Sequence, residues 1–220
     1  MRRWAGIAGI VFVVLAFVSR VVPGNVPDPD SRDAIAKFAK FYADSSHNDN
    51  AVIGFVLGVV GLFAFAWFLG GLWSSLRNAE GAATTPTIIV AVGGAAFVAL
   101  GMTYHAFADG VGVTLHFSKG YTISQGFDPG TAILFTSVAQ GIFLASMLAV
   151  GATTAAAGAV ILRTRALPVW LAWVGLVIAA LCLATIPPLT FIAAILLAVW
   201  VLVISVLMIQ AEMRGAPAGA

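Results

Sequence analysis

Six long apolar stretches, almost free of charged residues, alternate with polar connections along this 220-residue chain. A helix needs about 20 apolar residues to cross the hydrocarbon core of a bilayer. The stretches therefore predict six transmembrane helices, at residues 4–22, 51–73, 86–108, 131–162, 168–186 and 189–210. The fifth stretch barely reaches the required length. The fourth exceeds it, so we expect that helix to tilt or to protrude from the bilayer.

The connection after the first stretch carries the pattern of an amphipathic helix. Apolar side chains recur with helical spacing at Ile35, Phe38, Ala39 and Tyr42. Residues 31–44 therefore predict a short external helix on the membrane interface, with Asp30 or Ser31 as its N-cap. This helix is either a connector that follows the membrane surface or a lid over a pocket between helices. Residues 45–50 predict a polar turn into the second span.

The second long polar connection, residues 109–130, is rich in glycine. A structureless loop of this length is uncommon in a compact domain. We therefore expect a short helix or a re-entrant segment around Val111–Phe117.

The composition agrees with a membrane protein. Hydrophobic residues make up 61% of the chain and charged residues 9%, whereas soluble domains are about 25% charged. The whole chain, residues 1–220, therefore predicts a single all-α membrane domain covered by lipid. A net charge of +2 with no basic patch predicts no nucleic-acid partner. The single cysteine, Cys182, lies in an apolar stretch, and we expect it to pack as a small buried side chain.

The ends of the stretches predict an orientation. Basic residues in short loops concentrate on the cytoplasmic side of membrane proteins. With the N-terminus inside, six arginines lie inside, and four of the five outer basic residues lie in or beside the long connection 20–50. Four tryptophans fall at inner ends, and all three tyrosines fall outside. We predict both termini in the cytoplasm. The first stretch follows Arg2–Arg3 like a signal peptide, but no A-x-A site follows it, so we expect a retained helix.

Small residues form faces on several of the predicted spans. Gly54 and Gly58 make a GxxxG pair, and Gly151, Ala155 and Gly158 line the fourth stretch. Such faces let helices approach closely in lipid. They serve either packing within one chain or contact with another membrane subunit or a second copy.

The candidate chemistry lies at the outer rim of the predicted bundle. His105 and Asp109 are four residues apart on one helical face, Tyr104 is adjacent, and His116 follows in the next connection. If these groups converge, they form either a polar pocket for a small molecule or lipid headgroup or a zinc or copper site. Otherwise they are ordinary interfacial residues. The chain contains none of the hydrolase, P-loop or dinucleotide motifs, so we predict no catalytic residue, no cofactor and no defined metal site.

The interiors of the spans lack Asp, Glu and Lys, the residues that proton-coupled carriers place there. Thr136, Ser137 and Gln140 share one helical turn of the fourth span. They either bind a ligand or form hydrogen bonds between helices, and the second role is the commoner one.

Four segments resemble an uncharacterised family of six-helix membrane proteins found in actinobacteria: Ile35–Asn50, Phe65–Gly81, Arg163–Ala180 and Leu196–Met208. The most specific signals are the Phe-Tyr-Ala-Asp helix and the Leu-Pro-x-Trp-Leu helix start. The resemblance implies six helices, a short external helix and a multi-pass protein of the bacterial plasma membrane. It implies no activity and no site residues.

Three functions remain open at this point. We expect a non-catalytic binding or accessory protein, whose partners are the lipid bilayer and other membrane subunits or a second copy. The alternative is an uncoupled carrier or channel for a small neutral or lipid-like solute, with a vestibule at Tyr104, His105 and Asp109. The third is a membrane enzyme with a metal at its outer face.

Overall fold

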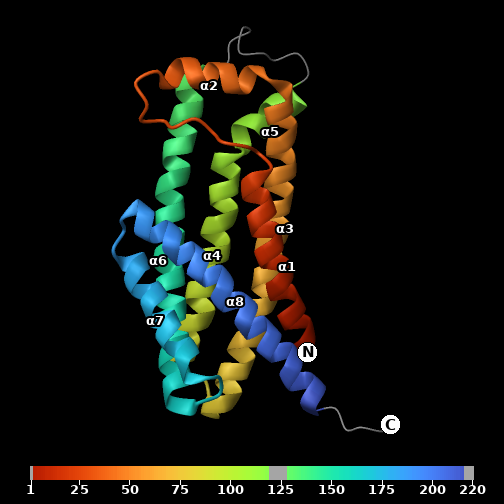
Figure 1. Cartoon of the computed structure of the whole chain (residues 1–220), viewed down its shortest axis with the longest axis vertical. Helices are drawn as coiled ribbons and strands as arrows, with labels where there is room; N and C mark the ends of the chain where they lie inside the picture. The colour runs from red at the N-terminus through yellow and green to blue at the C-terminus, as the bar shows by residue number, and fades with distance from the viewer. Residues whose placement is uncertain (1, 119–127, 216–220) are drawn as a thin grey trace. The chain divides into compact units, whose positions relative to one another are not determined.

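A computed structural model describes residues 2–118 and 128–215, with side chains for 3–118 and 128–212. Every regular element in these described ranges is a helix, which agrees with the predicted all-α class. The eight helices are α1 (Arg2–Val21), α2 (Ala34–Ala43), α3 (Ser45–Glu80), α4 (Thr85–Ala108), α5 (Gly110–Phe117), α6 (Pro129–Thr164), α7 (Val169–Leu183) and α8 (Pro187–Gly215) (Figure 1).

Five of these helices are long and apolar enough to cross a membrane: α1, α3, α4, α6 and α8. The predicted spans 4–22, 51–73, 86–108, 131–162 and 189–210 are thus confirmed as long apolar helices. The predicted span 168–186 is shorter than expected. Its helix, α7, has 15 residues and a length of about 22 Å. It stops at Leu183 because Thr185 adopts a left-handed conformation (φ 51°), and two prolines then begin α8.

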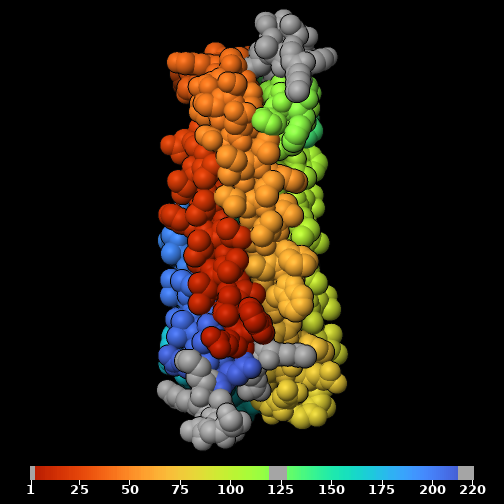
Figure 2. Space-filling model, turned by 90° about the vertical axis from the view of Figure 1, so that its right-hand side faces the viewer, coloured from red at the N-terminus to blue at the C-terminus, as the bar shows by residue number. Residues whose placement is uncertain are grey.

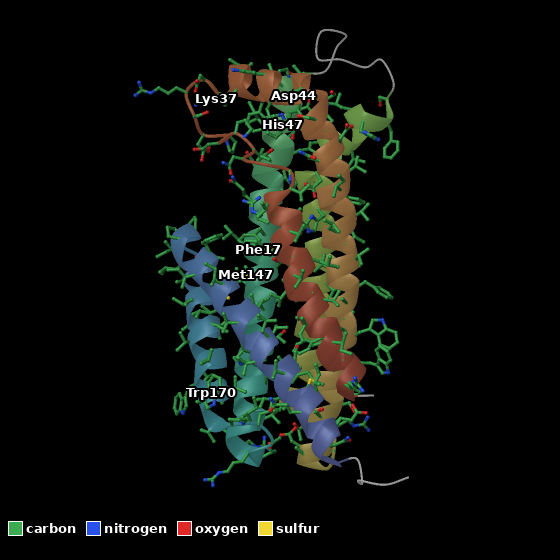
Figure 3. The ribbon with its side chains drawn as sticks, turned by 45° about the vertical axis from the view of Figure 1, so that its right-hand side comes forward. Phe17, Lys37, Asp44, His47, Met147 and Trp170 are labelled. Atoms are coloured by element: carbon green, nitrogen blue, oxygen red, sulfur yellow. The ribbon has the colours of Figure 1, made fainter. Side chains whose placement is uncertain are left out.

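The structure corrects the prediction of a polar turn at residues 45–50, which form the first turns of α3. Asp44 caps the start of this helix, because its Oδ1 accepts hydrogen bonds from the Ser46 backbone N–H (2.9 Å), a donor without a partner inside the helix, and from the Ser46 hydroxyl (2.7 Å). Asp44 and His47 are labelled at this junction in Figure 3. These Ser46 bonds hold the pKa of the Asp44 carboxyl below its usual value.

The predicted cap of the external helix is also wrong. The structure places Asp33, not Asp30 or Ser31, at the N-cap of α2. The Ser31 hydroxyl instead donates to the Asp28 carbonyl (2.9 Å), which closes a turn before the helix. Lys37 forms an ion pair with Asp33 (2.7 Å), and this contact lowers the pKa of the Asp33 carboxyl.

The chain forms two compact units. Unit 1 consists of residues 1–13, 62–99 and 144–220, and unit 2 consists of residues 14–61 and 100–143. Helices α1, α3, α4 and α6 contribute to both units, α7 and α8 only to unit 1, and α2 and α5 only to unit 2.

Unit 1 is held together by aromatic packing and by glycines where helices approach closely. The ring centroids of Phe12 and Phe65 lie 4.8 Å apart, and those of Phe65 and Phe97 lie 5.0 Å apart. Helices α7 and α8 form a hairpin (Figure 1), in which the Trp200 indole N–H donates to the Leu171 carbonyl (2.9 Å).

Glycines set the spacing of α6 and α7 in unit 1. A Cβ built on Gly158 would lie 3.0 Å from the Ala172 carbonyl oxygen, and one on Gly151 would lie 3.1 Å from Cβ of Cys182. Cys182 is buried and has no disulfide partner, as expected. Figure 2 shows α1 and α3 running side by side. At this contact a Cβ on Gly71 would lie 2.2 Å from Cβ of Ala5. The contacts of Gly151 and Gly158 with α7 show that the predicted small-residue face of the fourth span packs within the chain.

Unit 2 is capped by α2, which lies crosswise to α6 (Figure 1). Its buried face consists of Ala34, Phe38 and Tyr42, and these side chains pack with Val111 and Leu115 of α5 and Ala132 of α6. The amphipathic helix predicted over residues 31–44 and the helix predicted around Val111–Phe117 are both present as helices, and their apolar side chains pack against each other. The external position of the first stays a prediction. Ile35, expected on the apolar face, is 66% exposed. The register of α2 is thus set by Ala34 rather than by Ile35.

Candidate functional site

The predicted polar pair forms inside unit 2, where α4 ends. Nδ1 of His105 lies 2.8 Å from Oδ2 of Asp109, and the two side chains are only 15% and 11% exposed. The four-residue spacing places both on one face of the chain as α4 passes into α5. Asp109 also occupies the N-cap position of α5. A carboxylate at a helix N-terminus is favoured by the helix dipole.

The His105 ring packs directly against α3. A Cβ built on Gly58 would lie 2.2 Å from Cε1 and Nε2 of the imidazole, so only glycine leaves room for the ring. A Cβ on Gly54 would lie 2.5 Å from the Pro23 ring. Both glycines of the predicted GxxxG pair are therefore used inside this chain. This face holds His105 and Pro23 rather than a partner helix.

Tyr104 extends the same region with aromatic contacts. Its ring centroid lies 5.2 Å from that of His105 in an edge-to-face arrangement and 5.9 Å from that of Phe143 on α6. Edge-to-face pairs of this kind add to the energy of burial. Tyr104, His105 and Asp109, whose convergence the sequence left open, thus come together as a packed cluster.

His116 takes a different partner. Its Nδ1 lies 2.6 Å from Oδ1 of Asp49, near the start of α3, and the two side chains are 37% and 61% exposed. Among the described residues, no group of three or more His, Cys, Asp or Glu side chains is placed to hold a metal ion. Asp49 was missed because residues 45–50 read as a turn. The signal that identifies their helix is Asp44, a favoured N-cap residue.

A second polar group lies beneath α2. The Asn48 amide donates to the Tyr42 carbonyl (3.2 Å), and its Oδ1 is buried without a hydrogen-bond partner among the described residues. Burial raises the pKa of the Tyr42 phenol to about 12, and the nearby Asp109 carboxylate adds to the rise. Tyr42 therefore remains protonated at physiological pH. Its helical spacing marked it only as an apolar position.

One exposed surface of unit 2 differs from the rest of the candidate spans. We call it the α6 patch, and it consists of Leu134, Ser137, Val138, Gln140 and Gly141, all exposed on one face of α6. A Cβ built on Gly141 meets nothing within 4 Å. The Gln140 amide has no hydrogen-bond partner among the described residues, although it lies within a candidate membrane span.

The neighbouring hydroxyl groups are already bonded within α6. Thr136 donates to the Ala132 carbonyl (2.9 Å) and Ser137 to the Ile133 carbonyl (3.0 Å). The bonds expected between helices are therefore absent for these two hydroxyls, because each side chain reaches the carbonyl four residues earlier. Gln140 is the member of this trio that remains available to another molecule.

These contacts define what each part of unit 2 can do. The His105–Asp109 pair is packed against Gly58 and stabilises the fold, whereas the α6 patch presents a small-residue surface and an amide to its surroundings. Comparison of the chain with protein-family models, with curated proteins and with solved structures found no match. The geometry of the chain itself is therefore the basis for a functional proposal.

Proposed function

We propose that this chain is a non-catalytic accessory protein of a membrane, and that it binds another transmembrane helix through the α6 patch. The observation that carries the proposal is Gln140, an exposed amide in a candidate span that has no hydrogen-bond partner among the described residues. In hydrocarbon an amide without a hydrogen bond is costly. A partner helix that supplies one typically contributes about 1–2 kcal/mol in model peptides.

Gly141 adds the geometry that helix association in lipid requires. Transmembrane helices associate where small residues let their backbones approach. Ser137 and Gly141 are four residues apart, and the space over Gly141 is open. Leu134 and Val138 lie on the same face of α6 as Gly141 and supply apolar contact area beside it.

The interior of unit 1 is closely packed around its threonine hydroxyls, and the buried Ser205 hydroxyl has no hydrogen-bond partner among the described residues. The hydroxyls of Thr153, Thr154 and Thr190 donate to carbonyls of their own helices at 2.8–3.0 Å. The cavity between Phe65, Phe97 and their neighbours has a volume of about 10 Å³. That is near the smallest space that holds one water molecule. The threonine hydroxyls are satisfied without water or a solute.

The proposal includes the predicted topology: six spans, with α7 as the short fifth span and both termini in the cytoplasm. The apolar α7–α8 hairpin returns the chain to the side from which it started. Six spans are also what the resemblance to a six-helix actinobacterial family implies, and the proposal adopts the location that this resemblance implies, a bacterial plasma membrane. Cysteine-accessibility labelling of single cysteines at Ser31 and Ala82 tests the part of this topology that concerns α3, the long apolar helix between the two positions: opposite sidedness is expected, and labelling from the same side contradicts it.

Blue-native electrophoresis of the protein extracted in mild detergent tests the partner. We expect a band larger than the monomer for the wild type, loss of that band for Gly141→Ile, and its retention for Gly70→Ile. Gly70 is a matched control, because it is also an exposed helical glycine with nothing within 4 Å of a built Cβ. Co-expression of two differently tagged copies then shows whether the partner is a second copy. A monomeric wild type, or equal behaviour of the two variants, contradicts the proposal.

A further inference from the structure

A partly open groove of about 280 Å³ lies in unit 1, at the end where α3 finishes and α6 turns into α7. Leu72 and Leu76 of α3 form one wall, and Leu207 and Met208 of α8 form the other. Ala166 and Leu167 of the α6–α7 turn close one end. This volume is just below the usual range of small-molecule pockets, about 300–1,000 Å³.

The walls of the groove suit a hydrocarbon chain. Most of the lining is apolar, and none of the lining residues is charged. The hydroxyl of Ser75 already donates to the Gly71 carbonyl (2.9 Å), so it offers no free hydrogen to a ligand. Asn78 is exposed on α3 and places one amide at the groove. The groove is thus apolar along its length with a polar margin.

The charges around this end of unit 1 are unequal. The acidic side chain at the end of α3, Glu80, is 1% exposed and already engaged, because Arg163 lies 3.4 Å from its Oε1 and Thr84 donates to its Oε2. Arg165 is exposed, and no carboxylate of the described residues pairs with it. Its Cα lies about 3.8 Å from that of Ala166, which lines the groove.

The backbone at Arg165 is unusual. Its φ is 55°, the left-handed position after α6 at which glycine is the common residue. Arginine adopts that conformation less readily than the right-handed one. The local backbone therefore favours glycine over arginine at this position.

We propose that this groove binds one anionic phospholipid, with an acyl chain between α3 and α8 and the phosphate beside Arg165. The occupant follows from charge complementarity, since an apolar groove, next in sequence to an exposed arginine that pairs with no carboxylate of the described residues, matches an anionic amphiphile. One basic side chain near a membrane surface contributes about 1 kcal/mol to binding of anionic lipid, which is about fivefold in affinity.

Native mass spectrometry of the purified full chain, titrated with phosphatidylglycerol or with phosphatidylcholine of the same acyl chains, tests the site. We expect one retained lipid per chain, with phosphatidylglycerol bound about fivefold more tightly. Arg165→Gln should abolish this preference. Arg77→Gln should keep it, because Arg77 is exposed at the same end of α3 but its guanidinium lies over the Trp73 ring, 5.3 Å from the centroid. Equal effects of the two variants overturn the proposal.

Two further variants separate lipid binding from misfolding and from simple anion binding. Arg165→Gly removes the charge while matching the backbone conformation, so it should fold at least as well as wild type and still lose the preference. Ala79→Trp fills the groove and should prevent retention of either lipid, whereas Ser74→Trp, an exposed position away from the groove, should not. Glycerol phosphate, a headgroup without a chain, should not compete. Retention of lipid by Ala79→Trp, or competition by glycerol phosphate, overturns the proposal.

Discussion

Replacing Gly58 with alanine tests whether the close packing of His105 on α3 holds unit 2 together. The new Cβ would lie 2.2 Å from two atoms of the imidazole, whereas ordinary contact begins at 3.4 Å. The ring must therefore shift by roughly 1 Å or more. It cannot shift freely, because its Nδ1 is held 2.8 Å from the Asp109 carboxylate.

The cost can be estimated from these two constraints. Overpacking a well-packed contact costs about 1–3 kcal/mol, and losing a hydrogen bond to a charged group costs about 1.5–3 kcal/mol. Alanine also improves helix propensity by up to about 1 kcal/mol relative to glycine. We therefore expect Gly58→Ala to lower the free energy of unfolding by about 1.5–5 kcal/mol. Gly70→Ala, on the same helix with open space around it, should be neutral or stabilising by up to about 1 kcal/mol.

Thermal unfolding of the two variants in the same detergent, followed by intrinsic fluorescence, measures the difference. A double-mutant cycle with His105→Ala adds a second readout, because the Gly58 and His105 changes should be strongly non-additive, with a coupling of about 0.5–3 kcal/mol. If Gly58→Ala is as stable as Gly70→Ala, or if the two changes add independently, the ring does not occupy the space over Gly58 and the reasoning is refuted.

Three other outcomes are expected. Burial raises the pKa of Tyr42 to about 12, so the neutral phenol contributes about 2–3 kcal/mol to the free energy of unfolding below pH 10, and this contribution is lost as the pH rises toward 12. The unfolding midpoint of wild type should therefore fall more between pH 10 and pH 12 than that of Tyr42→Phe, and parallel curves would contradict this. Asp44→Ala should speed hydrogen exchange at the Ser46 backbone amide, because the variant loses the carboxylate that accepts its hydrogen bond. The exchange protection of wild type should fall to that of the variant as the pH drops below the Asp44 pKa, which the Ser46 bonds hold below its usual value. Trp200→Phe leaves the Leu171 carbonyl without its buried donor and should cost about 1–3 kcal/mol in thermal unfolding; an unchanged midpoint would argue against this bond.

The helices of this chain are readable from sequence because each depends on local composition. Long apolar runs have no alternative to helices in lipid, where each backbone group must be satisfied within its own segment. The short helix α5 was expected from the length of its connection. The start of α3 was not, because the polar residues 45–50 read as a turn while the capping role of Asp44 depends on two bonds to Ser46.

The candidate site divides in the same way. The four-residue spacing of His105 and Asp109 predicted that they share a face, and the structure joins them. His116 pairs with Asp49, which lies 67 positions earlier in the chain, so no local sequence pattern predicts this contact. The space that Gly58 leaves for His105 likewise depends on how α3 and α4 approach within unit 2.

By itself the amino-acid sequence determined the all-α class of the protein, the long apolar helices and the amphipathic helix α2, because hydrophobicity and periodicity act over neighbouring residues. Tertiary structure decided which small residues serve internal packing and which stay open, since Gly58 and Gly141 are alike in sequence and differ only in what lies above them. It also decided that His105 and Asp109 are packed inward while Gln140 is exposed. Such differences come from contacts between distant segments, which are set by the packing of whole helices.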